Sequence, residues 1–462
     1  MSIERKKSEV IWLPEPPPGP LKTFDLYTMA LGSAVGAGVI TFVGTAIAYT
    51  GYSAWLAYAL GVVWGLFIVL PHFFTSSTFR LGGGEYSTLG ALADERVAGV
   101  YALSKTLSAL TVGMYGASFA AYLASLLPNV QTRLIAVLVI AFFYVLNLYG
   151  VKAAAKVQNV MFIALVAALG IFIIFAIPHV NPDIFNFSHE NFFTGGSSGF
   201  FSAVVLLGSS CQAYYIVSMY GRQCRDATRD IPKAMLWCVP TIFILYVGCA
   251  IAGVGVLPLE EVAGKPLTMV AKTVLPGPLF LFFMIGGPLV AIATSINGII
   301  PGTTNLIGSA AENGWLPKSL ATRNKHGVQW KVLTLICLVG AIPCALGMNA
   351  SKIMTMANLF TSTMNILYLC CVTRIPTKFP EAWKNSRLHM PNFLFYILMT
   401  ISICVNIFVF YNSSKNLTLT NVLISVCLMI ICAVYALVRV RRGGIRLAIS
   451  LWPRKVEEEK TA

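Results

Sequence analysis

Long apolar runs separated by short polar segments dominate the chain from residue 22 to residue 438. A hydrocarbon layer about 30 Å thick takes roughly 20 helical residues to cross, and most runs approach or exceed that length. Because a backbone inside lipid must satisfy its own hydrogen bonds, such runs predict helices. Twelve spans are predicted, at 24–49, 54–77, 98–126, 132–149, 155–178, 198–220, 234–256, 278–310, 330–348, 353–372, 392–411 and 418–438. The pattern therefore predicts an all-α integral membrane protein with twelve transmembrane helices.

The spans also suggest how the chain is divided. A polar, proline-rich segment without the apolar stretch of a cleavable signal peptide precedes the first helix. If spans 1–5 and spans 6–10 are repeats, the chain has five parts. These are an N-terminal segment (1–21), a first repeat (22–178), a second repeat (197–372), two further spans (392–438) and a basic tail (439–462).

Charge then fixes the class of protein and its orientation. Only 11% of residues are charged and 57% are hydrophobic, whereas soluble domains carry about 25% charged residues. This excludes a water-soluble enzyme, and it makes a nucleic-acid partner the weaker explanation of the net charge of +15. Of 33 Lys and Arg, 27 fall on the side of the N-terminus, 5 on the other side, and Lys105 lies within the third span. The positive-inside rule therefore predicts that both termini are cytoplasmic. The expected location is the plasma membrane, as a multi-pass protein in contact with membrane lipid.

Two spans carry polar or glycine-rich interruptions at lipid depth. The first contains Gly32-Ser33-Ala34-Val35-Gly36-Ala37-Gly38, and the sixth contains Gly208-Ser209-Ser210-Cys211-Gln212-Ala213-Tyr214-Tyr215. Close packing through small residues is the alternative explanation of the first run. Interrupted helices at corresponding places of two inverted halves are typical of a substrate site at the bilayer midplane. Free amides there suit a carboxylate and free carbonyl oxygens suit an ammonium group, so the pattern favours an amino acid.

The sequence predicts neither a cofactor nor a metal site. The 11 cysteines form no CxxC pair, and most lie inside or at the ends of apolar runs. The 5 histidines are scattered without a ligand partner. Both patterns favour packing residues over a zinc site or a disulfide framework.

Five stretches, in order along the chain, resemble motifs of the amino acid–polyamine–organocation superfamily. They are Gly32–Ile40, Gly82–Tyr86, Asn147–Lys152 with Val157–Val160, Arg225–Pro232 and Ala311–Lys318, within roughly residues 22–391. The chain is similar to the L-type and basic amino acid antiporters of this superfamily. The resemblance implies a leucine-transporter-like core of 5+5 inverted repeats with discontinuous helices 1 and 6, plus two C-terminal helices. It implies alternating-access transport and no enzyme activity. The external loop 127–132 lacks the cysteine by which L-type relatives hold a heavy subunit, so no disulfide-linked partner is expected.

Carried over by position, the resemblance implies that both interruptions bind substrate. The expected substrate-binding residues are Ser33, Ala34, Val35, Gly36, Ala37, Gly38, Ser209, Ser210, Cys211, Gln212, Tyr214 and Tyr215. Ser33, Gly36, Ala37 and Gly38 would hold the carboxylate. Carbonyl oxygens around Ser33 and residues 209–212 would receive the ammonium group. Tyr214 and Tyr215 would line the side-chain pocket or its outer gate, unless they are ordinary packing residues. Gln212 stands where many relatives have a small residue, and it would narrow the pocket or bond a polar cargo.

The coupling ion stays open between Na⁺ and H⁺. Lys105 is the lone cation at lipid depth; it either snorkels to the cytoplasm or replaces a coupling cation or contacts an anionic cargo group. Thr294 and Ser295 lie where relatives bind sodium or pack against the first span. Apart from Asp25 at the start of the first helix, the spans hold no Asp or Glu, which disfavours cationic cargo.

The preferred function is a secondary active transporter, exchanger or facilitator, for a neutral or modestly polar L-amino acid. One alternative keeps the fold and carries an acidic amino acid, an organic anion or a nucleobase. An amino acid sensor is an alternative of another class. A membrane enzyme is disfavoured because the spans lack acid–base groups.

Overall fold

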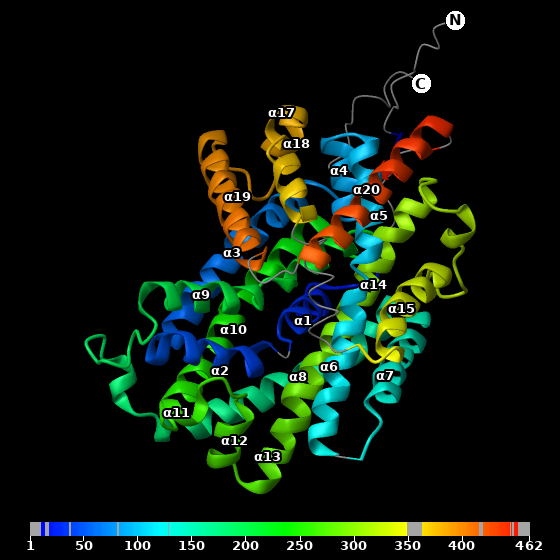
Figure 1. Cartoon of the computed structure of the whole chain (residues 1–462). Helices are drawn as coiled ribbons and strands as arrows, with labels where there is room; N and C mark the ends of the chain where they lie inside the picture. The colour runs from blue at the N-terminus through cyan, green and yellow to red at the C-terminus, as the bar shows by residue number, and fades with distance from the viewer. Residues whose placement is uncertain are drawn as a thin grey trace, which may run out of the picture.

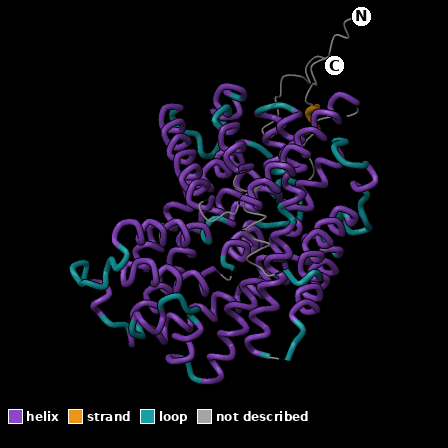
Figure 2. The backbone as a smooth tube through the Cα atoms, viewed as in Figure 1, coloured by secondary structure: helices purple, strands orange, loops and turns teal. Residues whose placement is uncertain are grey.

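The structure is a computed structural model that describes residues 11–13, 18–36, 38–80, 83–127, 129–348, 363–414, 419–443, 445 and 448–450. Figure 2 shows this part of the chain as helices joined by short loops. Two three-residue strands, β1 (Ile11–Leu13) and β2 (Ala448–Ser450), pair in parallel with Ile11 opposite Ala448. The all-α fold class is therefore confirmed for the described residues apart from this small terminal ribbon.

Helices α1 to α8 form the first part of the bundle (Figure 1). Their bounds are α1 Thr23–Ala34, α2 Gly38–Thr50, α3 Ala54–Thr78, α4 Glu85–Leu92, α5 Glu95–Leu107, α6 Leu110–Leu126, α7 Thr132–Leu148 and α8 Val151–Ala176. Short 3-10 turns follow α2 (η1, Gly51–Ser53) and α8 (η2 Ile177–His179 and η3 Pro182–Phe185). The predicted third span is thus two helices, because the chain turns at Ser108 and Ala109 between α5 and α6.

The second part begins at α9 and includes two irregular helical segments. The bounds are α9 Gly196–Ser209, the 3-10 segment η4 Ala213–Tyr220, α10 Ala227–Gly255, α11 Leu259–Val262, α12 Thr268–Val274, α13 Gly277–Met284, the π-helical η5 Ile285–Leu289 and α14 Val290–Glu312. After η6 (Lys318–Ala321) come α15 Trp330–Ala345, the helix Thr363–Val372, α17 Ile375–Lys378, α18 Pro380–Lys384, α19 Asn392–Ser414 and α20 Leu419–Arg442. The π-helical turn contains Pro288, which cannot donate a helical hydrogen bond.

Seven of the described helical segments are long and apolar enough to cross a membrane. They are Gly38–Thr78, Glu95–Leu126, Val151–His179, Gly196–Tyr220, Ala227–Gly255, Gly277–Glu312 and Asn392–Tyr411, and the shorter apolar helices are Thr132–Leu148, Trp330–Ala345 and Thr363–Val372. A multi-pass membrane protein is therefore supported. The finer prediction of twelve spans in two inverted repeats, with its domain boundaries, stays a prediction.

Helix α1 lies near the middle of the bundle (Figure 1), where it packs against α8, α10, α14 and η4. Close helix contacts use glycine. A Cβ built on Gly113 of α6 would lie 2.2 Å from the carbonyl oxygen of Gly340 in α15, and one on Gly61 of α3 would lie 3.0 Å from the amide of Gly208 in α9. Small residues let helix backbones approach where no water drives association.

A backbone clamp joins the segment before α1 to the segment after η4. The amides of Gly19 and Leu21 donate to the carbonyl oxygens of Cys224 and Gln223, each at 2.9 Å, and the amide of Arg225 donates to Leu21 at 3.1 Å. These bonds satisfy backbone groups of two segments that lie outside the helices. The start of α1 and the end of η4, which are the ends that lie away from the two breaks, are consequently connected to each other.

Candidate functional site

Both predicted helix breaks are present, and they touch. Helix α1 ends at Ala34 and α2 begins at Gly38, while α9 ends at Ser209 and η4 begins at Ala213. A Cβ built on Gly38 would lie 2.9 Å from the Cβ of Ser210, so the two breaks meet where only a glycine fits. Unwinding, rather than close packing of an intact helix, is therefore the correct interpretation of the Gly32–Gly38 run. Ala37 lies outside the described residues.

Neighbouring helices hold the carbonyl oxygens of the first break. The Tyr246 hydroxyl of α10 donates to the Ala34 carbonyl at 2.9 Å, and the Ser295 hydroxyl of α14 reaches that of Gly32 at 3.4 Å. The Ser33 hydroxyl donates within its own helix, to Met29 at 2.7 Å. Ser33 is thus a packing residue in this conformation, and it is the backbone of the break that the neighbouring helices orient.

The second break is stabilised by side chains that bond back onto α9. The hydroxyls of Ser209 and Ser210 donate to the carbonyl oxygens of Leu206 and Leu207, each at 2.6 Å, and the Gln212 amide donates to Ser209 at 3.3 Å. Such local bonds compete with the helical ladder and favour its termination. Ser209, Ser210 and Gln212 are half-buried, whereas Cys211 is buried.

A buried amide joins three helices behind the first break. Gln158 of α8 is fully buried, and its Nε2 lies within donating distance of the carbonyl oxygens of Thr28 (3.3 Å) and Thr294 (3.4 Å). Its Oε1 accepts a hydrogen bond from Asn297 at 2.7 Å. Beside it, Asn159 donates to the Asp25 carboxylate at 3.0 Å. The sequence motif around residues 157–160 therefore braces α1 against α8 and α14.

Thr294 and Ser295 of α14, the residues expected to take part in coupling, also lie against α1. The hydroxyl of Thr294 donates to Ala291 at 2.8 Å, and that of Ser295 lies 3.0 Å from the same carbonyl and 3.4 Å from the carbonyl of Gly32. The structure thus shows packing against the first span, while a role in coupling stays a prediction.

A buried ionic cluster lies beside the second break, and its central residue was not predicted. Glu85, at the start of α4, is 1% exposed and lies 3.1 Å from the Lys105 ammonium of α5. Its other carboxylate oxygen lies 2.9 Å from Nε2 of His72 in α3, and the Tyr101 hydroxyl also donates to Glu85. Lys105 is 5% exposed, so the snorkelling interpretation of this lysine is wrong.

The charge state of Glu85 follows from these neighbours. Burial alone would raise the pKa of the carboxyl group, but the Lys105 ammonium and the hydrogen bonds from His72 and Tyr101 outweigh it and lower the pKa to about 2. Glu85 is therefore ionised and compensates Lys105. The signal that could have found it is Lys105 itself, because a buried cation needs a counter-charge.

Tyr215 links this cluster to the second break. Its ring centroid lies 5.7 Å from the Lys105 ammonium and 4.5 Å from the imidazole ring of His72. Tyr214 points elsewhere: it is buried, its hydroxyl has no hydrogen-bond partner among the described residues, and its ring faces Phe73. The two neighbouring tyrosines therefore have different surroundings, and only Tyr215 contacts the ionic cluster.

Among the described residues, no group of three or more His, Cys, Asp or Glu side chains could hold a metal ion. The cysteines are free, and most are buried.

The chain matches the family described as amino acid permease over residues 21–435. It is 24% identical to a branched-chain amino acid permease of Bacillus subtilis over 70% of this chain and 74% of that protein. It is 22% identical to a histidine permease of Lactococcus lactis over 69% of this chain and 72% of that protein. A probable threonine/serine transporter of Bacillus subtilis is 24% identical over 65% of this chain and 68% of the relative.

Proposed function

The chain belongs to the amino acid permease family, and from this membership we propose that it is a secondary active transporter of a neutral or modestly polar L-amino acid. Transport would proceed by alternating access, as an exchanger or a facilitator. The observation that carries the proposal is the meeting of two broken helices, with Gly38 against Ser210, in the middle of the bundle.

The backbone at the breaks suits the two charges that every α-amino acid carries. The Gly38 amide at the start of α2 would bind the carboxylate, joined by that of Gly36 once it leaves the Ala34 carbonyl, to which it donates at 2.9 Å here. Carbonyl oxygens around Ser33 and residues 209–212 would receive the ammonium group. Gln212, half-buried at the second break, would contact the cargo side chain. This arrangement selects the amino acid backbone and leaves the side chain to the pocket wall.

The charge balance beside the site favours a cargo without net charge. Glu85 and Lys105 neutralise each other, so neither offers an uncompensated partner for a charged side chain. An acidic amino acid, organic anion or nucleobase is the second candidate, since Lys105 would serve it, but Lys105 would first have to leave Glu85. The relatives described as branched-chain, threonine/serine and histidine permeases fit the first proposal better.

Counterflow in liposomes tests this proposal. The purified full chain is reconstituted with one unlabelled amino acid inside, and entry of the labelled amino acid is followed for a panel that spans apolar, hydroxylated, basic and acidic side chains. We expect exchange of apolar or hydroxylated amino acids and none for lysine or arginine. Exchange confined to glutamate or aspartate would favour the second candidate. Specific binding without exchange of any amino acid would favour a sensor.

Na⁺ and H⁺ are both candidates for coupling, through Lys105, Thr294 and Ser295. The Lys105→Ala variant tests the first of these. Uptake, pH profile and sodium response that are all unchanged in this variant would remove Lys105 from the coupling hypothesis.

A further inference from the structure

His72 lies at the cytoplasmic side predicted for α3, enclosed between two aromatic rings. Its imidazole stacks on Tyr368 with centroids 4.6 Å apart and packs against Tyr215 at 4.5 Å, and the residue is 3% exposed. Histidine is the side chain whose ordinary charge change falls between pH 5 and 8. His72 lies between η4, the segment after the second helix break, and the ionic cluster of Glu85 and Lys105. A change in its protonation would therefore affect the contacts of both.

The hydrogen bond to Glu85 determines which ring nitrogen carries the proton. An ionised carboxylate only accepts, so Nε2 of His72, 2.9 Å from Glu85, must be the N–H donor. In the neutral imidazole, Nδ1 then carries the lone pair. Nδ1 is buried and has no hydrogen-bond partner among the described residues. It is the position at which a further proton would bind.

The closed cluster offers no acceptor for a proton at Nδ1. The groups that face His72 are Glu85 from α4, Lys105 and Tyr101 from α5, Tyr215 from η4, and Tyr368 from the helix Thr363–Val372. The Glu85 carboxylate is shared between His72 and Lys105, so a proton on His72 would give the cluster one net positive charge. It would also create a buried N–H without an acceptor.

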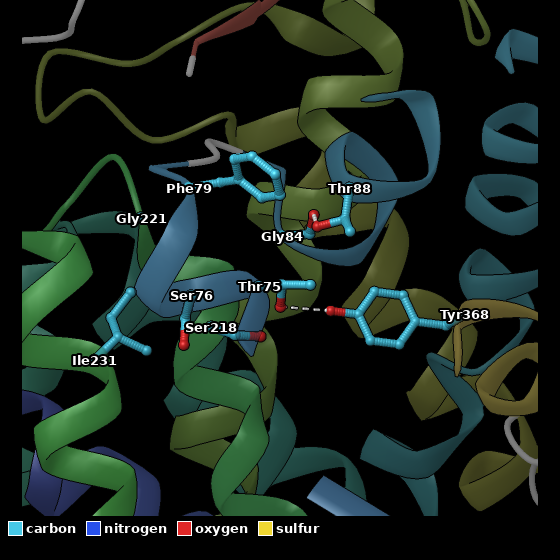
Figure 3. Close-up of a pocket in the computed structure, with 9 residues that line it drawn as sticks. All are labelled: Thr75, Ser76, Phe79, Gly84, Thr88, Ser218, Gly221, Ile231 and Tyr368. Atoms are coloured by element: carbon cyan, nitrogen blue, oxygen red, sulfur yellow. Dashed lines mark hydrogen bonds between the residues drawn. The ribbon is translucent and has the colours of Figure 1, made fainter. Parts of the chain in front are cut away.

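A small cavity lies beside Tyr368, which forms part of its lining. It is lined by Thr75, Ser76, Thr88, Ser218 and Tyr368 among others, and its volume of about 10 Å³ gives room for about one water molecule (Figure 3). In its lining, the hydroxyls of Tyr368 and Thr75 lie 2.8 Å apart. The Ser218 hydroxyl of η4 also belongs to the lining, and it is buried without a hydrogen-bond partner among the described residues. A displacement of η4 would therefore remove both the Tyr215 ring from His72 and one wall of this cavity.

We propose that His72 is a proton-binding site of the transport cycle, occupied at Nδ1 when η4 moves away and empty when Tyr215 and Tyr368 close over the ring. The proposal rests on the transport function proposed above and assigns the proton as the ion linked to it. By linkage, any state in which His72 is hydrated is favoured by acid in the compartment that it faces.

The test measures exchange of an amino acid that the counterflow panel has identified, with equal pH on both sides of the membrane, from pH 5.5 to 8. The wild type is compared with His72→Gln, whose amide can still donate to Glu85 but does not titrate. His179→Gln is the matched control, because His179 is exposed in a turn after α8. Gel filtration checks that each variant is folded. If His72→Gln does not fold, His72→Asn is used in its place.

Because one titrating group changes a rate by up to tenfold per pH unit, we expect a change of about fourfold or more in the wild type and in His179→Gln across this range. In His72→Gln we expect a nearly flat profile. A flat wild-type profile, or the same pH dependence in His72→Gln, would overturn the proton site while leaving amino acid transport intact. Absence of exchange for the whole panel would overturn the proposed function, and this role of His72 with it.

Discussion

Tyr58 and Tyr246 pack ring against ring, with centroids 4.9 Å apart, and each hydroxyl bonds a different helix break. Tyr246 donates to the Ala34 carbonyl at 2.9 Å, and the hydroxyls of Tyr58 and Ser210 lie 3.1 Å apart. Both tyrosines are fully buried, on α10 and α3 respectively. One aromatic pair therefore positions both halves of the candidate substrate site relative to each other.

Removing one of these hydroxyls should weaken transport. In Tyr246→Phe the ring remains, but the Ala34 carbonyl loses a hydrogen bond worth about 1 kcal/mol, so we expect an increase in the apparent KM for exchange of about fivefold. Tyr144→Phe is the control, because it removes a hydroxyl bonded to Thr334 between α7 and α15, away from both breaks. Equal effects of the two substitutions on KM would contradict a role of Tyr246 in shaping the site.

The Glu85–Lys105 pair should be needed for stability as a pair. Removing one partner of a buried ion pair leaves an uncompensated charge and typically costs about 3–5 kcal/mol. We expect Glu85→Gln and Lys105→Met each to lower the melting temperature strongly, and the double variant to recover a large part of the loss. Thermal unfolding followed by tryptophan fluorescence measures all four proteins. Additive losses in the double variant would show that the two side chains do not stabilise each other.

The pH dependence of that stability follows from the pKa of Glu85, which is lowered to about 2. A carboxyl group whose pKa is lower in the folded state stabilises the protein above its unfolded pKa of about 4.3, and this contribution is lost as the pH falls toward 2. The difference in melting temperature between wild type and Glu85→Gln should therefore be constant from pH 5 to 8 and shrink below about pH 4. A difference that shrinks already between pH 7 and 5 would contradict the ionised state of Glu85.

Gln158 should be far more sensitive to substitution than an exposed glutamine. Gln158→Leu keeps a similar volume but leaves the donor of Asn297 and the carbonyls of Thr28 and Thr294 without their shared partner, and each such buried group costs about 1–3 kcal/mol. Gln131→Leu is the matched control at the exposed start of α7. We expect a large drop in melting temperature for the first substitution and almost none for the second. Equal melting temperatures would show that the amide is not a brace.

Substitution of glycine by alanine should have opposite effects on stability at Gly113 and at Gly170. In Gly113→Ala the new Cβ would lie 2.2 Å from the backbone oxygen of Gly340, which cannot move without separating α6 from α15. In Gly170→Ala, within α8, the Cβ meets nothing within 4 Å, and alanine favours a helix by up to about 1 kcal/mol. We expect Gly113→Ala to destabilise the protein and Gly170→Ala to leave it unchanged or slightly stabilised. Melting temperatures of the two variants decide the matter.

Sequence was sufficient for the features that follow from lipid as a solvent. Glycine and polar residues at lipid depth predicted the breaks in α1–α2 and α9–η4. Irregular backbone is tolerated at that depth only where it is buried in protein or lines a cavity, so such residues mark a site inside the bundle. The turn at Ser108 and the π-helical segment around Pro288 were not predicted, since neither interrupts the apolar pattern. Pro288 removes a helical donor without changing the hydropathy of its span, so hydropathy alone does not reveal it.

Glu85 shows why the ionic cluster needed the structure. Its sequence position, after a run of glycines between two spans, is typical of a solvent-exposed loop. In the fold, α4 turns back and places this carboxylate against α3 and α5, where it meets His72 and Lys105. A lone lysine in an apolar span indicated that a partner was needed, but its identity depends on contacts between segments that are not adjacent in the sequence.

The backbone clamp between Leu21 and residues 223–225 has a mechanical consequence. Because α1 and η4 are tied at their outer ends, they form one lever, and a swing of either half-helix carries the other with it. Spin labels placed on α1 and on η4 should therefore keep a constant separation through the cycle, while their distances to α3 change. The two half-helices would then rotate together about the two breaks, and the bound amino acid would lie at the point about which they rotate.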